Sequence, residues 1–245
     1  MHSQADHMNR NFLFACYRYP RGEILRHLET DYIQRSITVS CKQIIVQIGG
    51  LGWENDFIDC SLYKNYIILD SQSVGSQDAK KIQAEPSRMP LQSDSVDMIL
   101  LPHLLEFDAD RLQIMREVER VLRPEGVLVV LNFNPWNVWV RYRALWERRK
   151  LGYLQGRFIS RSRLVDWLNL LNFEITLSTE FGYNSMISTH GRFIAHHSSI
   201  TSISYAIKAI KRRYNVIPLT PVKETKPRLV LANSINSSSQ RAGHE

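Results

Sequence analysis

The sequence predicts an α/β protein with a doubly wound, mostly parallel sheet and helices on both faces. Four short runs are rich in Val, Ile and Leu, which is typical of strands buried on both faces. Segments with helical spacing lie between these runs, and strands that alternate with helices need crossover connections. The chain has 245 residues, of which 44% are hydrophobic. This length is enough for one such domain and too short for two ordinary ones.

The apolar runs define the expected strands. They are IIVQI (44–48), YIILD (66–70), VDMILL (96–101) and VLVVLNF (127–133), with two further strands expected at 173–177 and 203–210. One helix is expected after Pro20, and a second over 108–122. We expect 123–126, which reads Arg-Pro-Glu-Gly, to stop the second helix. A third helix is expected to begin at Ser160, which suits an N-cap.

The expected organisation is a single domain over residues 1–233. It includes an N-terminal helical segment (1–40) and a lid insertion (137–160), and a Ser/Asn-rich disordered tail follows at 234–245. The polar start and the absence of a long apolar stretch predict neither a secretory signal nor a transmembrane helix. Three cysteines without a CxxC motif predict reduced thiols, no metal site and a cytoplasmic protein.

The formal net charge of +7 at first suggests a nucleic-acid or membrane partner. Most of it lies in two segments. Residues 139–163 carry eight basic residues and one acidic residue, and residues 208–228 carry seven and one, so the rest of the chain has a net charge of −6. The sequence therefore indicates a mildly acidic body with two basic segments, the second of which we interpret as surface charge.

In a doubly wound sheet, ligands bind at the carboxyl ends of the strands, so the residues that end each run are the informative ones. The first run ends in a glycine loop with Gly49, Gly50 and Gly52. The second ends in Asp70, a carboxylate whose distance along the chain suits the ribose hydroxyls of a nucleoside cofactor. An intact phosphate-binding loop or dinucleotide motif is absent, which disfavours ATP and NAD.

Residues 85–130 carry a more specific pattern. Its ordered features are Glu85, Met89-Pro90-Leu91, Ser95-Val96-Asp97, His103-Leu104-Leu105-Glu106 and Leu122-Arg123-Pro124-Glu125-Gly126. In these features the sequence resembles the class I S-adenosylmethionine-dependent methyltransferases, specifically the type 11 methyltransferase domain. It is most similar to a bacterial subgroup with Leu-Pro-His in one strand and Phe-Asn-Pro-Trp after the next. The resemblance covers about residues 40–180 and implies a Rossmann-like fold.

The resemblance implies S-adenosylmethionine as cofactor. The backbone of the loop with Gly49, Gly50 and Gly52 would lie along its methionine part. Asp70 would accept from its ribose hydroxyls, and Glu85 would lie near its adenine. The sequence also departs from the family pattern. Gln47 stands where the family has an acidic residue, and Leu51 and Trp53 stand at the second and third glycine positions.

Methyl transfer needs mainly positioning, since the donor is already activated. His103, which follows the third expected strand (96–101), is the candidate base for a protonated acceptor. Its alternative role is to hydrogen-bond the loop or flank the cofactor. Asn134 and Trp136 follow the next strand and are candidate substrate-binding residues.

Segment 137–157 has one apolar helical face made of Trp139, Tyr142, Leu145 and Trp146, flanked by arginines. This helix either packs on the core or recruits an anionic or membrane-associated lipophilic substrate; nucleic-acid contact is the third alternative. The sequence favours a methyltransferase acting on a small molecule, and it leaves the oligomeric state open. The alternatives are a catalytically silent relative that acts as a binding or regulatory module and, less favoured, an RNA methyltransferase.

Overall fold

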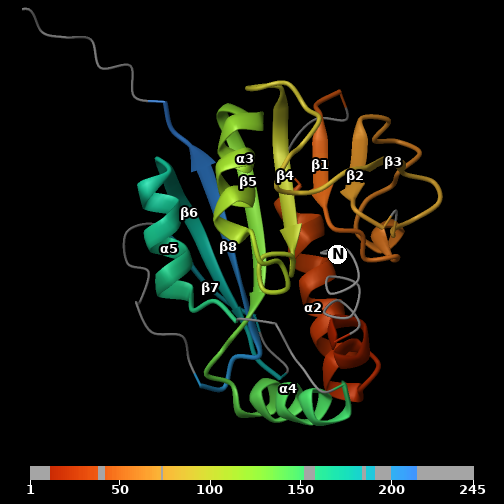
Figure 1. Ribbon diagram of the computed structural model, residues 1–245, viewed down its shortest axis with the longest axis vertical. Helices are drawn as coiled ribbons and strands as arrows, with labels where there is room; N and C mark the ends of the chain where they lie inside the picture. Colours follow the sequence, from red (N-terminus) through yellow and green to blue (C-terminus); the bar gives the residue numbers. More distant parts are fainter. Residues whose placement is uncertain are drawn as a thin grey trace, which may run out of the picture. The chain divides into compact units, whose positions relative to one another are not determined.

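The computed structural model describes residues 12–37, 42–72, 74–151, 158–183, 186–190 and 200–213, and every statement below concerns these residues (Figure 1). The expected tail at 234–245 and the domain end at residue 233 lie outside them, as does most of the second basic segment. Residues 12–17 are helical and precede the first long helix. None of the described helices is long and apolar enough to cross a bilayer.

Eight strands form one sheet in the order β3-β2-β1-β4-β5-β8-β6-β7 (Figure 1). Strands β1 to β5 pair in parallel, whereas β8 runs antiparallel to both β5 and β6, and β7 is antiparallel to β6. The strand order reverses between β1 and β4. The bounds are β1 Ile45–Ile48, β2 Tyr66–Asp70, β3 Lys80–Gln83, β4 Val96–Pro102, β5 Leu122–Phe133, β6 Phe173–Phe181, β7 Met186–His190 and β8 Ser204–Lys211.

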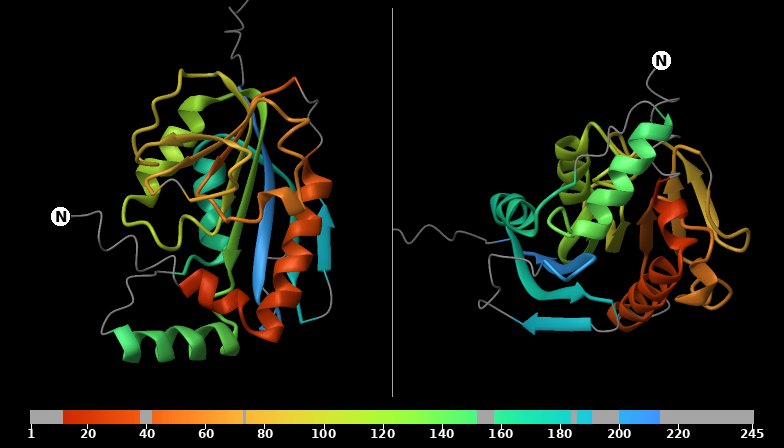
Figure 2. Two further views of the ribbon diagram at one scale, coloured as in Figure 1. Left: turned by 90° about the vertical axis from the view of Figure 1, so that its right-hand side faces the viewer. Right: turned by 90° about the horizontal axis from the view of Figure 1, so that it is seen from below.

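Helices cover the sheet on both faces (Figure 2). Alternate residues of β4 divide between two cores: Met98 and Leu100 belong to the core that includes α2, and Ile99 and Leu101 to the core that includes α3 and α5. This alternation is the expected result of side chains pointing to opposite faces along a strand. The helices are α2 Pro20–Ser36, the 3-10 turn η1 Glu54–Asp56, α3 Arg111–Val121, α4 Val138–Leu151 and α5 Arg161–Leu170.

The predicted fold class is confirmed, and the expected strands and helices are present with small changes of boundary. The 3-10 turn η1 is the only helical element between β1 and β2, so on that face α2 supplies the packing. Ser160 caps α5 by accepting a hydrogen bond from the Arg163 amide, as predicted. Strands β3 and β7 were not predicted. The sequence KKIQ of β3 has only one apolar residue, because this strand lies at an edge of the sheet.

The segment Arg123-Pro124-Glu125-Gly126 does follow the end of a helix, because α3 ends at Val121. It does not form a simple loop, however. It lies inside β5, where the pairing with β4 shifts between Leu122 and Val127. Glu125 adopts a φ of 63° in this irregularity. Pro and Gly therefore mark a bulge here as well as a helix end.

Candidate functional site

The five parallel strands bring all of the predicted site residues to one edge of the sheet. Asp70 pairs with Gln83 at the ends of β2 and β3, and the Gly49 amide donates to Leu69 O just beyond the end of β1. His103 follows β4 directly, and its amide donates to Leu131 O of β5. The glycine loop, Asp70 and His103 thus lie at the carboxyl ends of adjacent strands, on either side of the point where the strand order reverses.

The glycine loop is held by Asp70. The Gly50 amide donates to Asp70 Oδ2 at 2.8 Å, and the Gln72 amide donates to Oδ1 at 2.9 Å. A carboxylate accepts hydrogen bonds through both of its oxygens, which is the chemistry that hydroxyl donors require. The chemistry of Asp70 therefore fits the ribose role, and the same side chain also fixes the loop.

A second carboxylate holds the loop from its other side, and the sequence reasoning missed it. Glu54, at the start of η1, is buried and accepts hydrogen bonds from the amides of Leu51 (2.5 Å) and Gly52 (3.1 and 3.0 Å). It also accepts from Gln47 Nε2 at 3.0 Å. The sequence signal that could have identified Glu54 is an acidic residue two positions after Gly52. Glu54 supplies a negative charge directly beside Gln47, where the family pattern has its acid.

The loop is also closed against the segment that follows β2. A Cβ atom added to Gly50 would lie 2.0 Å from Val74 O, so only glycine fits at this position. The Ser76 amide donates to Glu54 Oε2 at 2.8 Å, which ties the same segment to the same carboxylate. Gly52 differs, because its φ is 92° and nothing lies within 4 Å of its missing Cβ. Gly52 is therefore the point where a ligand can approach the backbone.

Glu85 is exposed and lies two residues beyond the end of β3. The Ala84 amide donates to Asp70 O, so Glu85 follows immediately after the pairing of β2 and β3. This position is compatible with a ligand that extends from Asp70 along the edge. Its adenine role stays a prediction.

His103 lies in a buried network of charged groups. Its Nδ1 is 3.1 Å from Glu106 Oε2, and its Nε2 is 3.2 Å from Glu29 Oε1 of α2. Tyr17 and Ser204 donate to Glu29, and the Phe133 amide donates to Glu106. The network therefore joins α2 to the carboxyl ends of β4 and β5. Glu29 and Tyr17 are functional candidates that the sequence could not connect with His103, because they lie far from it along the chain.

The two carboxylates decide the protonation of His103. Burial disfavours the charged ring, but the Glu29 charge and the hydrogen bonds to Glu106 and Glu29 outweigh it and raise the His103 pKa to about 9. Burial raises the pKa of Glu106, and the hydrogen bond from His103 opposes this shift. At neutral pH the ring is thus an imidazolium with both N–H groups donated to carboxylates. Its role as a base stays a prediction and requires this proton to leave first.

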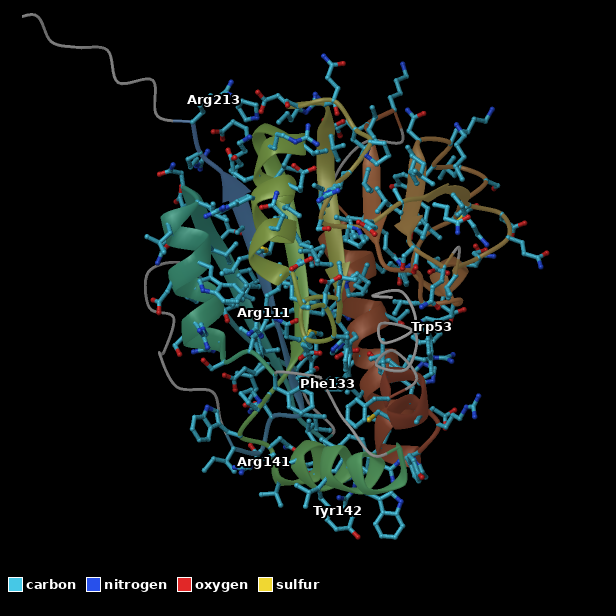
Figure 3. The ribbon with its side chains drawn as sticks, viewed as in Figure 1. Trp53, Arg111, Phe133, Arg141, Tyr142 and Arg213 are labelled. Atoms are coloured by element: carbon cyan, nitrogen blue, oxygen red, sulfur yellow. The ribbon has the colours of Figure 1, made fainter. Side chains whose placement is uncertain are left out.

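Aromatic side chains surround the network. The Phe133 ring lies 4.3 Å from the His103 ring, and Tyr17 packs edge-on against Trp53 at 5.3 Å between ring centroids. Phe12 lies 5.9 Å from Phe133. Trp53 and Phe133 are labelled in Figure 3. Trp53, at the third glycine position of the family pattern, therefore packs against residues 12–17.

Asn134 and Trp136 differ in their surroundings. Asn134 is buried, donates to Ser202 O and Oγ, and accepts from the Trp136 amide, so it shapes the turn after β5. Trp136 is 59% exposed. Their substrate-binding role stays a prediction. Among the described residues, no group of three His, Cys, Asp or Glu side chains has a geometry that could hold a metal ion.

Comparison with known proteins agrees with this geometry. Residues 53–130 match the family model described as a methyltransferase domain. The match begins after the glycine loop, which is the part of the site that departs from the family pattern. An uncharacterized protein of Escherichia coli (strain K12), YafS, is 29% identical over 198 residues, which are 80% of this chain and 79% of YafS.

Solved structures show the same fold. An S-adenosylmethionine-dependent methyltransferase of Thermotoga maritima, described as a possible histamine N-methyltransferase, has a TM-score of 0.59 and 18% identity, and the match covers 84% of this chain and 99% of that one. A methyltransferase of Archaeoglobus fulgidus has a TM-score of 0.55 and 14% identity, over 76% of this chain and 94% of that one.

The sheet has the fold of S-adenosylmethionine-dependent methyltransferases, and residues 53–130 match the methyltransferase domain family. The match and the fold support an enzyme that transfers a methyl group and uses S-adenosylmethionine as cofactor. The matched segment, residues 53–130, covers about a third of the chain.

Proposed function

We propose that this protein transfers a methyl group from S-adenosylmethionine to a small-molecule acceptor at the carboxyl edge of β1, β2 and β4. The observation that carries the proposal is the glycine loop, which is fixed between two carboxylates, Glu54 on one side and Asp70 on the other. The methyltransferase domain match supports the same reaction.

The charge of the loop suits a cationic ligand. All four amides of residues 49–52 donate within the protein: to Leu69 O, Asp70, Glu54 and Glu54 in turn. The charged groups at the loop are therefore the carboxylates of Glu54 and Asp70. Their negative charge favours the sulfonium and ammonium groups of the cofactor. When bound, S-adenosylmethionine supplies a methyl group that bonds to the acceptor's lone pair as the sulfur–carbon bond breaks and sulfur keeps the electron pair.

The chain's own residues position the reactants. Among the described residues nothing lies beside the Gly52 Cα, and Asp70 is a carboxylate of the kind that accepts from ribose hydroxyls. The buried charges of Glu29, His103 and Glu106 fix α2 against the same edge. Proximity and orientation are the main contributions that methyl transfer needs from a protein. An acceptor that loses a proton needs a base, and His103 is our candidate for it.

The second candidate function is a catalytically silent binding module. The observation that favours it is the same set of internally donated amides, together with Leu51 and Trp53 at two glycine positions. This alternative makes the opposite prediction for cofactor binding, so one experiment separates the two. An RNA methyltransferase is less favoured, since the body outside the two basic segments is net acidic.

Calorimetric titration with S-adenosylmethionine and S-adenosylhomocysteine tests the proposal. We expect both to bind, with the sulfonium form tighter because of the two carboxylates. Asp70→Asn keeps an oxygen for the Gly50 amide but loses the charge, and we expect it to weaken binding about tenfold or more. Asp166→Asn, on the exposed side of α5, is the matched control.

No heat at millimolar ligand would favour the silent module. Incubation of the protein with a cell extract and a donor carrying an isotope-labelled methyl group then tests turnover. We expect at least one labelled small molecule that the Asp70→Asn variant forms more slowly. Cofactor binding without any labelled product would contradict catalysis and leave binding alone.

A further inference from the structure

Helix α4 turns large apolar side chains toward solvent. Tyr142 is 61% exposed, Leu145 55% and Trp146 43%, and Val138 at the start of the helix is 69% exposed. Their spacing of three to four residues places them on one side of the helix. Trp136 lies just before the helix. These five residues, Trp136, Val138, Tyr142, Leu145 and Trp146, are called the α4 surface below.

The opposite side of α4 holds the helix in place. Val140 and Ala144 are buried, and the Arg143 guanidinium lies 3.8 Å from the centre of the Tyr19 ring. Asn137 Oδ1 accepts from the amides of Trp139 and Val140, which fixes the first turn. The outward direction of the α4 surface is therefore set by packing. Figure 3 shows Tyr142 on the side of α4 that faces away from the sheet.

The exposure of these side chains bears on two roles that the sequence left open for this helix, packing on the core and contact with a partner. The apolar face predicted from the spacing contains Trp139, Tyr142, Leu145 and Trp146, and the last three are exposed. Trp139 packs against the core, whereas the other three residues of that face point to solvent. Contiguous exposed apolar side chains mark interaction surfaces, whereas single ones are ordinary.

The charge of α4 indicates what covers the surface. Arg141 is exposed beside the apolar residues, whereas Arg143 is buried against Tyr19 on the other side of the helix. The sequence adds Arg148, Arg149 and Lys150 against one acid, Glu147, at the end of the helix. A stripe of aromatic and aliphatic side chains on a basic helix is the composition of helices that lie in a membrane interface. Trp and Tyr suit this depth because one part of each ring system is apolar and the other polar. We propose that the α4 surface docks on an anionic lipid bilayer.

A lipid surface fits better than a nucleic acid. Val138 and Leu145 cannot stack on bases, and they bury favourably only in an apolar medium. Figure 1 shows α4 beyond the carboxyl ends of β4 and β5, so docking would turn this edge of the sheet toward the bilayer.

Flotation of the full chain with vesicles tests the proposal and does not depend on methyl transfer. We expect binding to phosphatidylcholine vesicles that contain phosphatidylglycerol, weaker binding to phosphatidylcholine alone, and release at high salt. The triple variant Tyr142→Ser, Leu145→Ser, Trp146→Ser should bind at least about tenfold more weakly. Leu112→Ser and Leu170→Ser, at exposed positions on other helices, should bind like the parent protein.

Charge gives a second comparison. Arg141→Glu should weaken binding to the anionic vesicles, whereas Arg116→Glu, exposed on α3, should have little effect. The proposal is wrong if neither vesicle binds the protein, or if the triple variant binds as well as the parent. A dimer in sedimentation that the triple variant dissociates, without lipid binding, would assign the surface to a second copy. RNA binding lost in the triple variant, without lipid binding, would assign it to nucleic acid.

Discussion

The side-chain amide of Gln47 donates to the carboxylate of Glu54, with 3.0 Å between Nε2 and Oε1. The Gln47 carbonyl oxygen accepts from the Tyr66 hydroxyl at 2.6 Å, so the orientation of the amide is fixed. The negative charge that the family pattern places at position 47 is thus present at position 54. The departure at Gln47 is a relocation of charge, and the loop keeps its anionic partner.

Exchange of these two residues tests the relocation. Gln47→Glu alone places two buried carboxylates in contact, and we expect a loss of about 3 kcal/mol in the free energy of unfolding. Glu54→Gln alone weakens the bonds from Leu51 and Gly52, at a cost of about 2 kcal/mol. The double exchange restores one carboxylate and one amide. In urea denaturation, the double variant should therefore lose less unfolding free energy than the two single variants lose together.

Additive losses in this double-mutant cycle would contradict a shared role. Titration with S-adenosylmethionine adds a second readout on the same proteins. Binding that is weak in Glu54→Gln and recovers in the double variant would tie the charge to the cofactor. Asp78→Asn, at an exposed carboxylate, is the control.

Two neighbouring glycines should respond differently to alanine. In Gly50→Ala the new Cβ would lie 2.0 Å from Val74 O, so the segment after β2 must move. We expect a loss of about 3 kcal/mol and of cofactor binding. Gly52→Ala meets open space and costs only the strain of φ 92°, about 1 to 2 kcal/mol. Thermal unfolding should rank Gly50→Ala below Gly52→Ala, and the reverse order would contradict the described packing.

The pKa of His103 predicts a pH dependence of stability. Because the folded pKa is raised to about 9 from 6.5, the ion network stabilises the protein fully below pH 6.5. This stabilisation is lost as pH rises through 9, and its full size is about 3 kcal/mol. His103→Asn, whose side chain tolerates the φ of 50° at this position, removes the titrating group.

The difference in unfolding free energy between the parent and His103→Asn should therefore shrink from pH 6.5 to 9. Denaturant titrations across this range measure it directly. His27→Asn, at an exposed histidine of α2, is the control. A constant difference would mean that His103 is neutral in the folded protein.

The strand ends could be predicted because apolar runs end abruptly in residues such as Gly49 and Asp70. Glu54 could not be, because its role arises only when the loop folds back onto a turn two residues later. The partners of His103 were hidden for a related reason, since Glu29 reaches it from a distant helix. Helical spacing correctly grouped Tyr142 with Leu145, but spacing alone does not show which side of a helix packs.

The second basic segment was interpreted as surface charge, and within its described part Lys211 corrects this. Lys211 is 3% exposed, and its Nζ donates to Asp94 Oδ1 at 2.9 Å and to Leu122 O at 2.7 Å. A third bond goes to Glu119 O at 2.5 Å, so one ammonium group caps the end of α3 and the bulge that follows it. Sequence composition counts this charge but does not show that it is buried.

Lys211→Met should therefore be far more destabilising than loss of the Arg213 charge. The variant leaves two buried carbonyls and the Asp94 carboxylate without this donor, and we expect a loss of about 3 kcal/mol in unfolding free energy. Arg213 pairs with the same carboxylate at 2.9 Å but is largely exposed, so Arg213→Met should cost less than about 1 kcal/mol. Urea denaturation of the two variants gives the comparison. Equal losses would show that Asp94 pairing, and not the capping of α3, is what Lys211 contributes.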